Sequence, residues 1–310
     1  IGGCDSSGKC AVNDLSYIIL DAEEDVALNS EEIVIRVSED MPDSFLLRCC
    51  EIAKKLCGKF KFIGDKAAIS QMLVDGRTIE QARNYVVIGC TSPSVPGQSI
   101  DWLHSSLNAA MVLEMTFNNG ISPVSHLQAG PRTGRAEDFV TYEQLWEAYK
   151  TQLIYTRNVA RLRGNIELEN DAKMSPNPFQ SSLSPICFDR GLDIIEGGTA
   201  PNITIALSVG AIPNAADALA AIKKLVFEEK KLSMSKLMDA CRADFIGYED
   251  VLDMLKKAPK FGNDDDYVDS IVQQIIDVLD ETPSQHNYIF GAKPTVAAAI
   301  VTGNVPLGKM

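Results

Sequence analysis

The sequence predicts an α/β protein, because short β-branched or apolar runs alternate along it with longer amphipathic segments. Two runs carry the strand pattern most clearly. "EEIVIRV" at residues 31–37 alternates apolar and polar side chains, and "YVVIG" at residues 85–89 is almost wholly apolar, as in a strand buried on both faces. The chain has 310 residues, of which 45% are hydrophobic, so it can bury a large core.

The first elements follow from spacing and capping residues. Residues 12–22 predict a helix, with apolar side chains at helical spacing and Asn13 or Asp14 as its cap. After the strand at 31–37, a helix is predicted over 41–58, ending at Gly58. Cys49 and Cys50 lie in the middle of this helix. Packing explains that pair better than redox or acyl-transfer chemistry does.

Helical patterns dominate the rest of the chain. Residues 101–120 predict a helix with one apolar face that ends at Gly120. The run "PTVAAAIVTG" near the end fits either a buried strand or a helix. Further helices are predicted over residues 141–163, 213–231, 233–243, 248–257 and 266–280.

Charge and cysteine usage narrow the class of protein. The 29 Lys and Arg against 42 Asp and Glu give a net charge of −13, which repels nucleic acid and anionic lipid. We therefore expect neither a nucleic-acid nor a membrane partner. With no apolar run long enough to span a bilayer, a cytoplasmic location is expected. Eight scattered cysteines fit a reducing compartment, and three distant histidines predict no metal site.

Cys90 has the most specific setting of the eight thiols. It ends an apolar run, follows Gly89 and precedes a loop that contains Pro93 and Pro96. In α/β proteins, the loops beyond strand ends commonly carry reacting groups. The alternative is a small buried hydrophobe, since free cysteine is often interior. A Cys/His thiol hydrolase would take His104 or His126 as its base.

Several strings together resemble the glycyl radical enzymes, the superfamily that includes pyruvate formate-lyase. The opening "IGGCDSSGKCAVNDLSYIILDA" is similar to their Gly-rich segment that leads into a helix, and "ARNYVVIGC" to the strand that delivers their thiyl-radical cysteine. "LEMTFNNG", "TGRAEDFVTYEQLWEAYKTQLIY", "NPFQSSLSPICFDRGLDIIEGG", "DALAAIKKLVFEEKKLSM" and "APKFGNDDDYVDSI" follow in the family's order. The resemblance covers essentially all 310 residues.

The resemblance implies one pyruvate formate-lyase-like domain over residues 1–310, part of a ten-stranded α/β barrel of two antiparallel half-barrels. Cys90 would form a thiyl radical that abstracts hydrogen from a small organic substrate. The reaction would be C–C, C–O or C–X cleavage or radical addition. Thr91, Ser92, His104 and His126 are the expected substrate-binding residues.

The same resemblance implies the partners. No cofactor is expected to be bound. An organic glycyl radical is expected on a C-terminal segment that this sequence lacks, installed by a radical S-adenosylmethionine (radical-SAM) activating enzyme. The sequence shows neither the family's N-terminal helical part nor its "RVxGY" motif. A core fragment that is inactive alone, from a homodimeric enzyme, is therefore expected.

Departures from the family pattern leave the reaction open. Ser92 stands where the family's eliminases usually have a catalytic Glu, and Thr91 stands where pyruvate formate-lyase has a second cysteine. No arginine lies between Cys90 and Arg132, where a fumarate-adding relative would need one, and Pro201 replaces a Tyr that often approaches the cavity. The alternatives are a non-catalytic structural relative and the thiol hydrolase.

Overall fold

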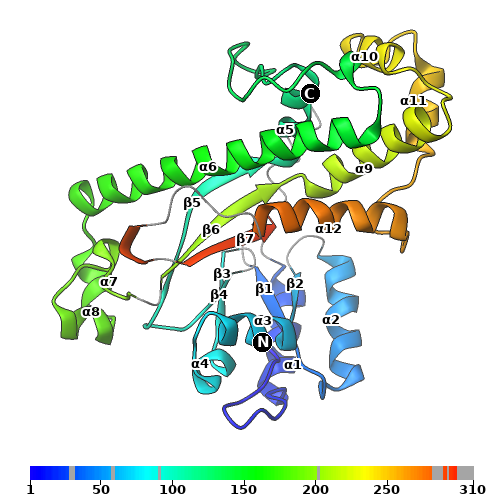
Figure 1. Ribbon diagram of the computed structural model, residues 1–310. Helices are drawn as coiled ribbons and strands as arrows, with labels where there is room; N and C mark the ends of the chain where they lie inside the picture. The colour runs from blue at the N-terminus through cyan, green and yellow to red at the C-terminus, as the bar shows by residue number, and fades with distance from the viewer. Residues whose placement is uncertain are drawn as a thin grey trace. The chain divides into compact units, whose positions relative to one another are not determined.

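The chain divides into two compact units in a computed structural model (Figure 1). Unit 1 comprises Ile1–Asp101 and Asn177–Ile203, and unit 2 comprises Trp102–Pro176 and Thr204–Met310. The structure describes residues 1–27, 32–56, 60–89, 92–200, 203–280, 289–291 and 293–298. Only the backbone is described for residues 100–105, 203–206, 291, 293–295 and 298. These parts form a mixed α/β architecture, as the sequence predicts.

A parallel pair of strands lies at the centre of unit 1. β1 (Ile33–Val37) runs parallel to β2 (Phe60–Gly64), and α2 (Asp43–Lys55) provides the crossover that a parallel pair requires. The N-terminal segment adds to the other edge of β1 through a parallel bridge between Gly2 and Arg36. The predicted strand and helix of this region are confirmed, while the predicted helix end at Gly58 lies outside the described residues.

The core of unit 1 forms between this sheet and two helices. α1 (Asp14–Val26) begins at Asn13, whose side chain accepts a hydrogen bond from the Leu15 backbone amide, so the predicted cap is confirmed. Tyr17 on α1 packs edge-on against Phe45 on α2, with ring centres 5.1 Å apart. The fully buried residues of this core are Leu20, Ile35, Phe45, Cys49 and Ile52.

The remaining elements of unit 1 are short. They are α3 (Asp65–Val74), α4 (Ile79–Arg83), β3 (Val86–Ile88), β4 (Ser92–Ser94), α7 (Pro178–Ser182), α8 (Pro185–Arg190) and the 3-10 turn η2 (Ile194–Glu196). Ala68 and Met72 on α3 pack with Ala82 and Val95 into a second apolar cluster around Tyr85. Two members of this cluster flank the strand pair in the sequence: Tyr85 directly precedes β3, and Val95 directly follows β4.

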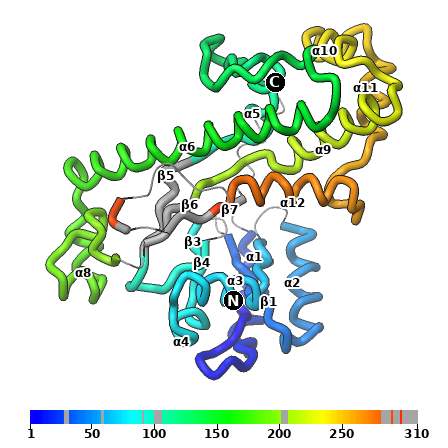
Figure 2. The backbone as a smooth tube through the Cα atoms, in the orientation of Figure 1, coloured from blue at the N-terminus to red at the C-terminus, as the bar shows by residue number. Residues whose placement is uncertain are grey.

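Unit 2 combines a three-stranded sheet with the longest helices. The strand order is β5 (Ile100–Asn108), β6 (Ile203–Gly210), β7 (Lys293–Ala298), with β6 and β7 parallel. α9 packs against α12, and α5 against α6 and α9 (Figure 2). The helical elements are α5 (Ala109–Phe117), α6 (Tyr142–Met174), α9 (Ile212–Ile222), α10 (Met234–Arg242), α11 (Glu249–Lys256), α12 (Asp266–Asp280), the π-helix η3 (Lys223–Glu228) and the 3-10 turns η1 (Ala136–Asp138) and η4 (Ile289–Gly291).

The predicted helix over 101–120 is wrong in its first half. Residues 100–108 form β5, and α5 starts only at Ala109, where the Asn108 side chain accepts a hydrogen bond from the Met111 amide. The segment "DWLHSSL" places its leucines four residues apart, a spacing that fits a helix, while its polar residues break the helical face. The alternative left open near residue 294 is settled by β7 as a strand.

The structure describes seven strands, in sheets of two, two and three, within the ranges given above. The ten-stranded barrel therefore stays a prediction. Among the described residues, no helix is both long enough and apolar enough to cross a membrane.

The adjacent cysteines of α2 give a matched test of the core. Cys49 is fully buried in the first apolar cluster of unit 1, whereas Cys50 is exposed. Cys49→Ala is expected to lower the free energy of unfolding by about 1 kcal/mol, and Cys50→Ala by less than about 0.5 kcal/mol. Urea titration of both variants measures the difference. Equal losses would contradict this placement of the two thiols.

Candidate functional site

The stretch around Cys90 is a β-hairpin. β3 and β4 pair in antiparallel fashion, with Val86 opposite Ser94 and Ile88 opposite Ser92, so residues 89–91 connect the strands. Gly89 has a φ of +57°, in the left-handed region that favours glycine. Cys90 and Thr91 lie outside the described residues. The structure therefore defines the strands on either side of the thiol.

The strand before Cys90 is less buried than the sequence predicts. Val86 and Ile88 are 45% and 44% exposed, and Val87 is half-buried. Among the described residues β3 pairs with β4, and Val87 alone of the three packs against the cluster around Tyr85. The apolar run thus places one face on that cluster and leaves the other accessible, so the predicted burial on both faces is wrong for the described part.

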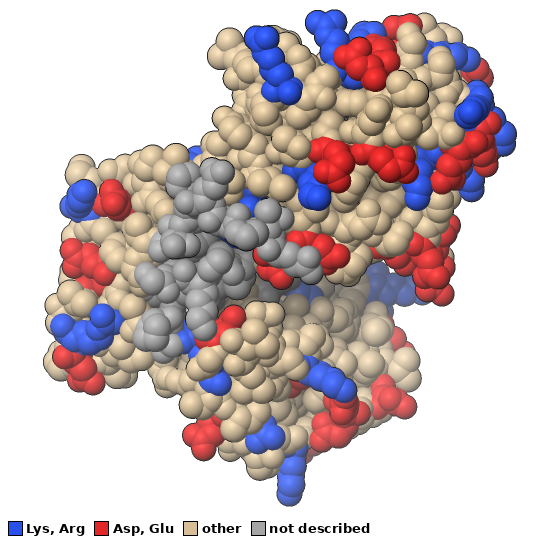
Figure 3. Space-filling model, in the orientation of Figure 1, with Lys and Arg blue, Asp and Glu red and all other residues tan. Residues whose placement is uncertain are grey.

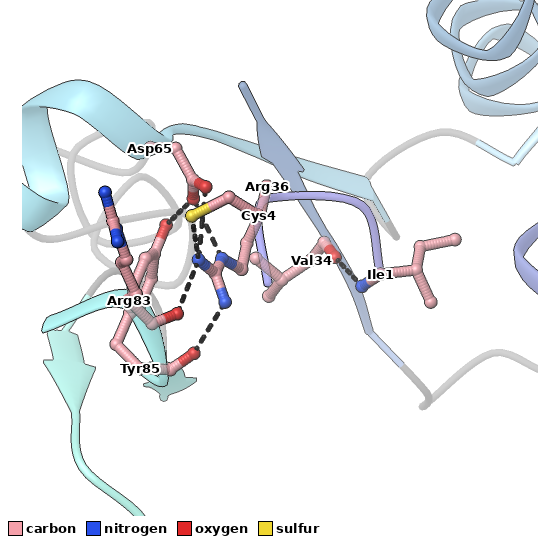
Figure 4. Close-up of polar contacts among 7 residues, drawn as sticks. All are labelled: Ile1, Cys4, Val34, Arg36, Asp65, Arg83 and Tyr85. Carbon is pink, nitrogen blue, oxygen red and sulfur yellow. Dashed lines mark hydrogen bonds and ion pairs between the residues drawn. The ribbon is translucent and has the colours of Figure 1, made fainter. Parts of the chain in front are cut away.

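A buried ion pair lies beside the residues that lead into the first strand of the hairpin (Figure 4). Arg36 on β1 donates from Nε to Asp65 Oδ1 at 2.8 Å and from Nη2 to Asp65 Oδ2 at 3.1 Å. The two side chains are only 14% and 3% exposed. This two-pronged geometry is the strong form of an arginine–carboxylate contact.

The same guanidinium holds the backbone at the start of the hairpin. Its Nη1 donates to the Tyr85 carbonyl at 3.1 Å, and its Nη2 donates to the Arg83 carbonyl at 3.0 Å. The Tyr85 hydroxyl donates to Asp65 Oδ1 at 2.8 Å, and Arg36 stacks 3.9 Å from the centre of the Tyr85 ring. Arg36, Asp65 and Tyr85 therefore form one network, which we call the anchor network.

The anchor network sets the charge state of its own members. Burial by itself would raise the pKa of Asp65, but hydrogen bonds from Arg36 and Tyr85 and the charge of Arg36 outweigh burial and hold that pKa below its ordinary value. Burial, followed by the hydrogen bond to Asp65, raises the pKa of Tyr85. The carboxylate and the neutral phenol are therefore the forms that the fold stabilises.

A second cation contacts the hairpin next to Cys90. Lys61 on β2 donates from Nζ to the carbonyl of Gly89 at 3.3 Å, and the same ammonium forms an ion pair with Glu32. The Lys61 side chain is 15% exposed. The carbonyl that directly precedes Cys90 in the chain is thus held from β2.

The returning strand is fixed by serines. The Ser94 and Ser99 hydroxyls lie 2.7 Å apart, and Ser99 Oγ also accepts from the Val95 amide at 2.7 Å. The carbonyl of Gly97 accepts from the Ser184 hydroxyl at 2.9 Å. Both ends of the hairpin are therefore tied to their surroundings by side chains.

The predicted substrate-binding residues lie on different elements of the structure. Ser92 begins β4, half-buried and opposite Ile88. His104 lies on β5 and not on a helix, and its side chain is outside the description. His126 is exposed in a loop of unit 2, with a φ of +58°. Of the four predicted residues, Ser92 is the one that the structure describes on the hairpin, whereas Thr91 lies next to Cys90 in the chain and outside the described residues. The proximity of the two histidines to Cys90 stays a prediction.

Three of the described thiols have raised pKa values, which disfavours the thiolate form. Burial, then the neighbouring Cys50, raises the pKa of Cys49 to about 11. Burial also raises the pKa values of Cys4 and Cys241.

Within the described residues, no group of three or more His, Cys, Asp or Glu could hold a metal ion. On the face shown in Figure 3, basic side chains lie among acidic ones and not in one continuous patch.

Sequence reasoning missed the anchor network. One signal was present: Arg36 interrupts the apolar run "IVIRV" of a predicted strand, and a charge in such a run usually has a buried partner. The partner itself could not be chosen, because Asp65 follows Arg36 by 29 residues and many other acidic residues were available.

The ion pair makes a prediction about stability and pH. Asp65→Asn leaves Arg36 without its counter-ion and is expected to lower the free energy of unfolding by about 3–5 kcal/mol. The matched control is Asp189→Asn at an exposed position, with an expected loss below about 0.5 kcal/mol. Because the folded pKa of Asp65 lies below its ordinary value of 3.8, its contribution is complete above that ordinary value and is lost as the pH falls from there through the lower folded pKa.

Urea unfolding of both variants and the unchanged chain, from neutral pH to below pH 3.8, measures these effects. The Asp65→Asn variant should show a shallower loss of stability in acid. An Asp65→Asn variant as stable as Asp189→Asn would contradict the structural role of the pair.

Gly89 makes a second prediction. Gly89→Ala puts a side chain at a left-handed φ and is expected to cost about 1–2 kcal/mol of unfolding free energy. Gly210→Ala is the control, because a Cβ there would meet only the Leu107 carbonyl oxygen, at 3.9 Å. Urea titration compares the two. A cost no larger at Gly89 than at Gly210 would show that the turn before Cys90 adopts another conformation.

Comparisons with known proteins show which family the chain belongs to. The family model described as pyruvate formate lyase-like matches residues 1–308. The chain is 37% identical over 297 residues to trans-4-hydroxy-L-proline dehydratase of Clostridioides difficile, covering 95% of this chain and 36% of that protein. It is 32% identical over 317 residues to isethionate sulfite-lyase of Desulfovibrio desulfuricans, covering 100% of this chain and 38% of the relative.

Solved structures show the same likeness. The crystal structure of hydroxyproline dehydratase from Clostridioides difficile matches with a TM-score of 0.87 and 35% identity, over 95% of this chain and 37% of that one. A structure on 1,2-propanediol dehydration in Roseburia inulinivorans matches with a TM-score of 0.88 and 32% identity, over 99% and 39%. The chain spans a little over a third of the length of these relatives. It belongs to the pyruvate formate lyase-like family of glycyl radical enzymes.

Proposed function

We propose that the protein carrying this chain is a glycyl radical enzyme in which Cys90 forms a thiyl radical. The observation that carries the proposal is the hairpin with Cys90 in its connection, held by Arg36 at its start and by Lys61 at the Gly89 carbonyl. A thiol that relays hydrogen atoms must meet the reacting atoms in a narrow range of geometry, and positioning supplies much of such catalysis. Arg36, which is held by the buried Asp65, and Lys61, which is paired with Glu32, would provide this positioning.

The thiyl radical would act by hydrogen-atom transfer. The sulfur radical takes a hydrogen atom from a substrate C–H bond, which gives the Cys90 thiol and a carbon radical. The carbon radical then loses its leaving group, and the product radical takes the hydrogen atom back from the thiol. The thiyl radical is restored, so the atoms and the unpaired electron balance.

Cleavage of a carbon–heteroatom bond in a small organic substrate is the reaction class that we propose. The relatives compared above are named as dehydratases and a sulfite-lyase, and this supports elimination over C–C cleavage or radical addition. Ser92 offers a hydroxyl but no carboxylate. A residue other than Ser92 would therefore handle the proton of the leaving group, and Thr91, His104 and His126 remain proposed substrate contacts.

The remaining components are proposals of the same kind. The glycyl radical would reside on a segment outside these 310 residues, installed by a radical-SAM activating enzyme, and no further cofactor is proposed. Residues 1–310 would form part of a ten-stranded barrel in a cytoplasmic homodimer. The second candidate function is a non-catalytic structural relative, which the replacement of the usual Glu by Ser92 favours.

Substitution of Cys90 tests the proposal in the protein that carries this chain. After anaerobic activation by a radical-SAM enzyme, electron paramagnetic resonance should show a glycine-centred signal in the unchanged protein and in Cys90→Ala. Turnover of diol, hydroxyproline and hydroxyalkylsulfonate substrates should be lost in Cys90→Ala, because the relay is absent. Turnover should persist in Cys50→Ala, whose thiol is exposed on α2.

The outcomes separate the two candidates. A glycine-centred signal with turnover that depends on Cys90 supports the enzyme. Undiminished turnover in Cys90→Ala would overturn the assignment of the thiyl residue. A protein that accepts no radical from the activase would support the structural relative. The 310-residue chain alone is expected to give no glycyl signal, since its sequence has no "RVxGY" motif.

A further inference from the structure

Two cysteines face each other in the loop that leads to the anchor network. Cys4 and Cys10 form an antiparallel bridge, with Asp5 N donating to Lys9 O at 2.8 Å and Ala11 N donating to Gly3 O at 2.9 Å. The neighbouring residues make both hydrogen bonds, so Cys4 and Cys10 occupy a non-hydrogen-bonded position. Directly opposite residues at such a position have Cα atoms about 4.5 Å apart and side chains on one face.

That spacing lies within the range that a disulfide requires, in which Cα atoms are about 4.4–6.8 Å apart. Both thiols are free and half-buried, so each is partly accessible. We propose that Cys4 and Cys10 are a thiol pair that closes to a cross-strand disulfide on reaction with a low-molecular-weight disulfide. This inference goes beyond the proposed function and does not depend on it.

The loop between the two cysteines is already ordered for closure. Asp5 Oδ1 accepts from the Ser7 amide at 2.9 Å, the Ser7 hydroxyl at 2.7 Å and the Lys9 amide at 3.0 Å. A Cβ on Gly8 would lie 2.7 Å from Arg83 Nη2, so the loop packs closely on that side chain. The backbone around the two cysteines is therefore held in place before closure.

The other described thiols lack such a partner. Cys49 and Cys50 are neighbours on a helix, and residues next to each other on a helix point in different directions. Their burial agrees, since Cys49 is buried and Cys50 exposed. Cys187 is buried, and Cys241 lies in an apolar pocket of unit 2. Among the described cysteines, Cys4 and Cys10 are thus the pair that lies directly opposite in a β-bridge.

The proposed disulfide adjoins the anchor network. Arg36 Nη2 lies 4.0 Å from Cys4 Sγ (Figure 4). The Arg83 guanidinium donates from Nη1 to the Ser6 carbonyl at 3.0 Å. Oxidation would therefore fix the loop over the two arginines, one of which holds the start of the Cys90 hairpin. This places a redox-sensitive bond next to the support of the proposed radical site.

The exchange reaction is balanced. A thiolate of the pair attacks the small disulfide and releases one small thiol, which leaves a mixed disulfide on the protein. The second thiolate attacks the protein sulfur and releases the other small thiol. The two protein sulfurs are oxidised and the small disulfide is reduced. Burial, then the charge of Asp65, raises the pKa of Cys4, so closure should accelerate as the pH rises.

Peptide mapping tests the pair directly. The folded protein, free of reductant, is incubated with oxidised glutathione, blocked with N-ethylmaleimide and digested with trypsin without reduction. Trypsin cleaves after Lys9, which separates the two cysteines, and next after Arg36. The peptide that ends at Lys9 and the peptide Cys10–Arg36 should therefore stay joined, and their separately blocked forms should be lost.

Variants make the result decisive. The joined species should persist in Cys241→Ser and be absent from Cys4→Ser, in which Cys10 should instead accumulate as a glutathione adduct. Recovery of both peptides with separate N-ethylmaleimide groups, under conditions that modify Cys50 or Cys241, would overturn the inference. Lasting glutathione adducts on Cys4 or Cys10 in the unchanged protein, without a joined species, would overturn it too.

Discussion

The anchor network is the constraint on which the hairpin around Cys90 depends. Arg36 lies on β1, Asp65 begins α3 directly after β2, and Tyr85 precedes β3. Removing two charges from water costs free energy, and this cost is offset here because the guanidinium also donates to two backbone carbonyls and the carboxylate also accepts from a phenol. The ion pair therefore fixes local geometry. It holds the backbone carbonyls of Arg83 and Tyr85, which lead into β3, in one position.

This constraint matches the chemistry that the family membership implies. A thiol that acts as a nucleophile needs a lowered pKa, whereas a hydrogen-atom relay needs placement and protection from side reactions. The described surroundings of Cys90 supply placement. Arg36 fixes the backbone before β3, Lys61 holds the carbonyl of Gly89, and Ser99 fixes the chain after β4. All of this support belongs to unit 1, and Arg36 and Lys61 lie far from Cys90 in the sequence.

Local signals predicted much of the fold. The cap at Asn13, the succession of β1 and α2, and the long helices of unit 2 follow from capping residues and periodicity, whereas β2 was not predicted. A helix was predicted where β5 begins, because apolar side chains four residues apart fit a helix as well as a strand that contains polar residues between them. The resemblance predicted the family, which the comparisons confirm, while the role of Cys90 stays a proposal. The anchor network was not predictable, since Arg36 and Tyr85 meet across 49 residues. Such a contact depends on tertiary folding and leaves no local pattern.

The most direct test of this account is amide hydrogen exchange in Arg36→Lys. Lysine keeps the positive charge beside Asp65 but lacks the planar fork that reaches the carboxylate and two carbonyls together. The account predicts faster exchange at the amides of β3 and β4, with the amides of α9 in unit 2 unchanged. Unchanged exchange in the hairpin, or equal acceleration in both units, would contradict the claim that Arg36 positions the strand that carries Cys90.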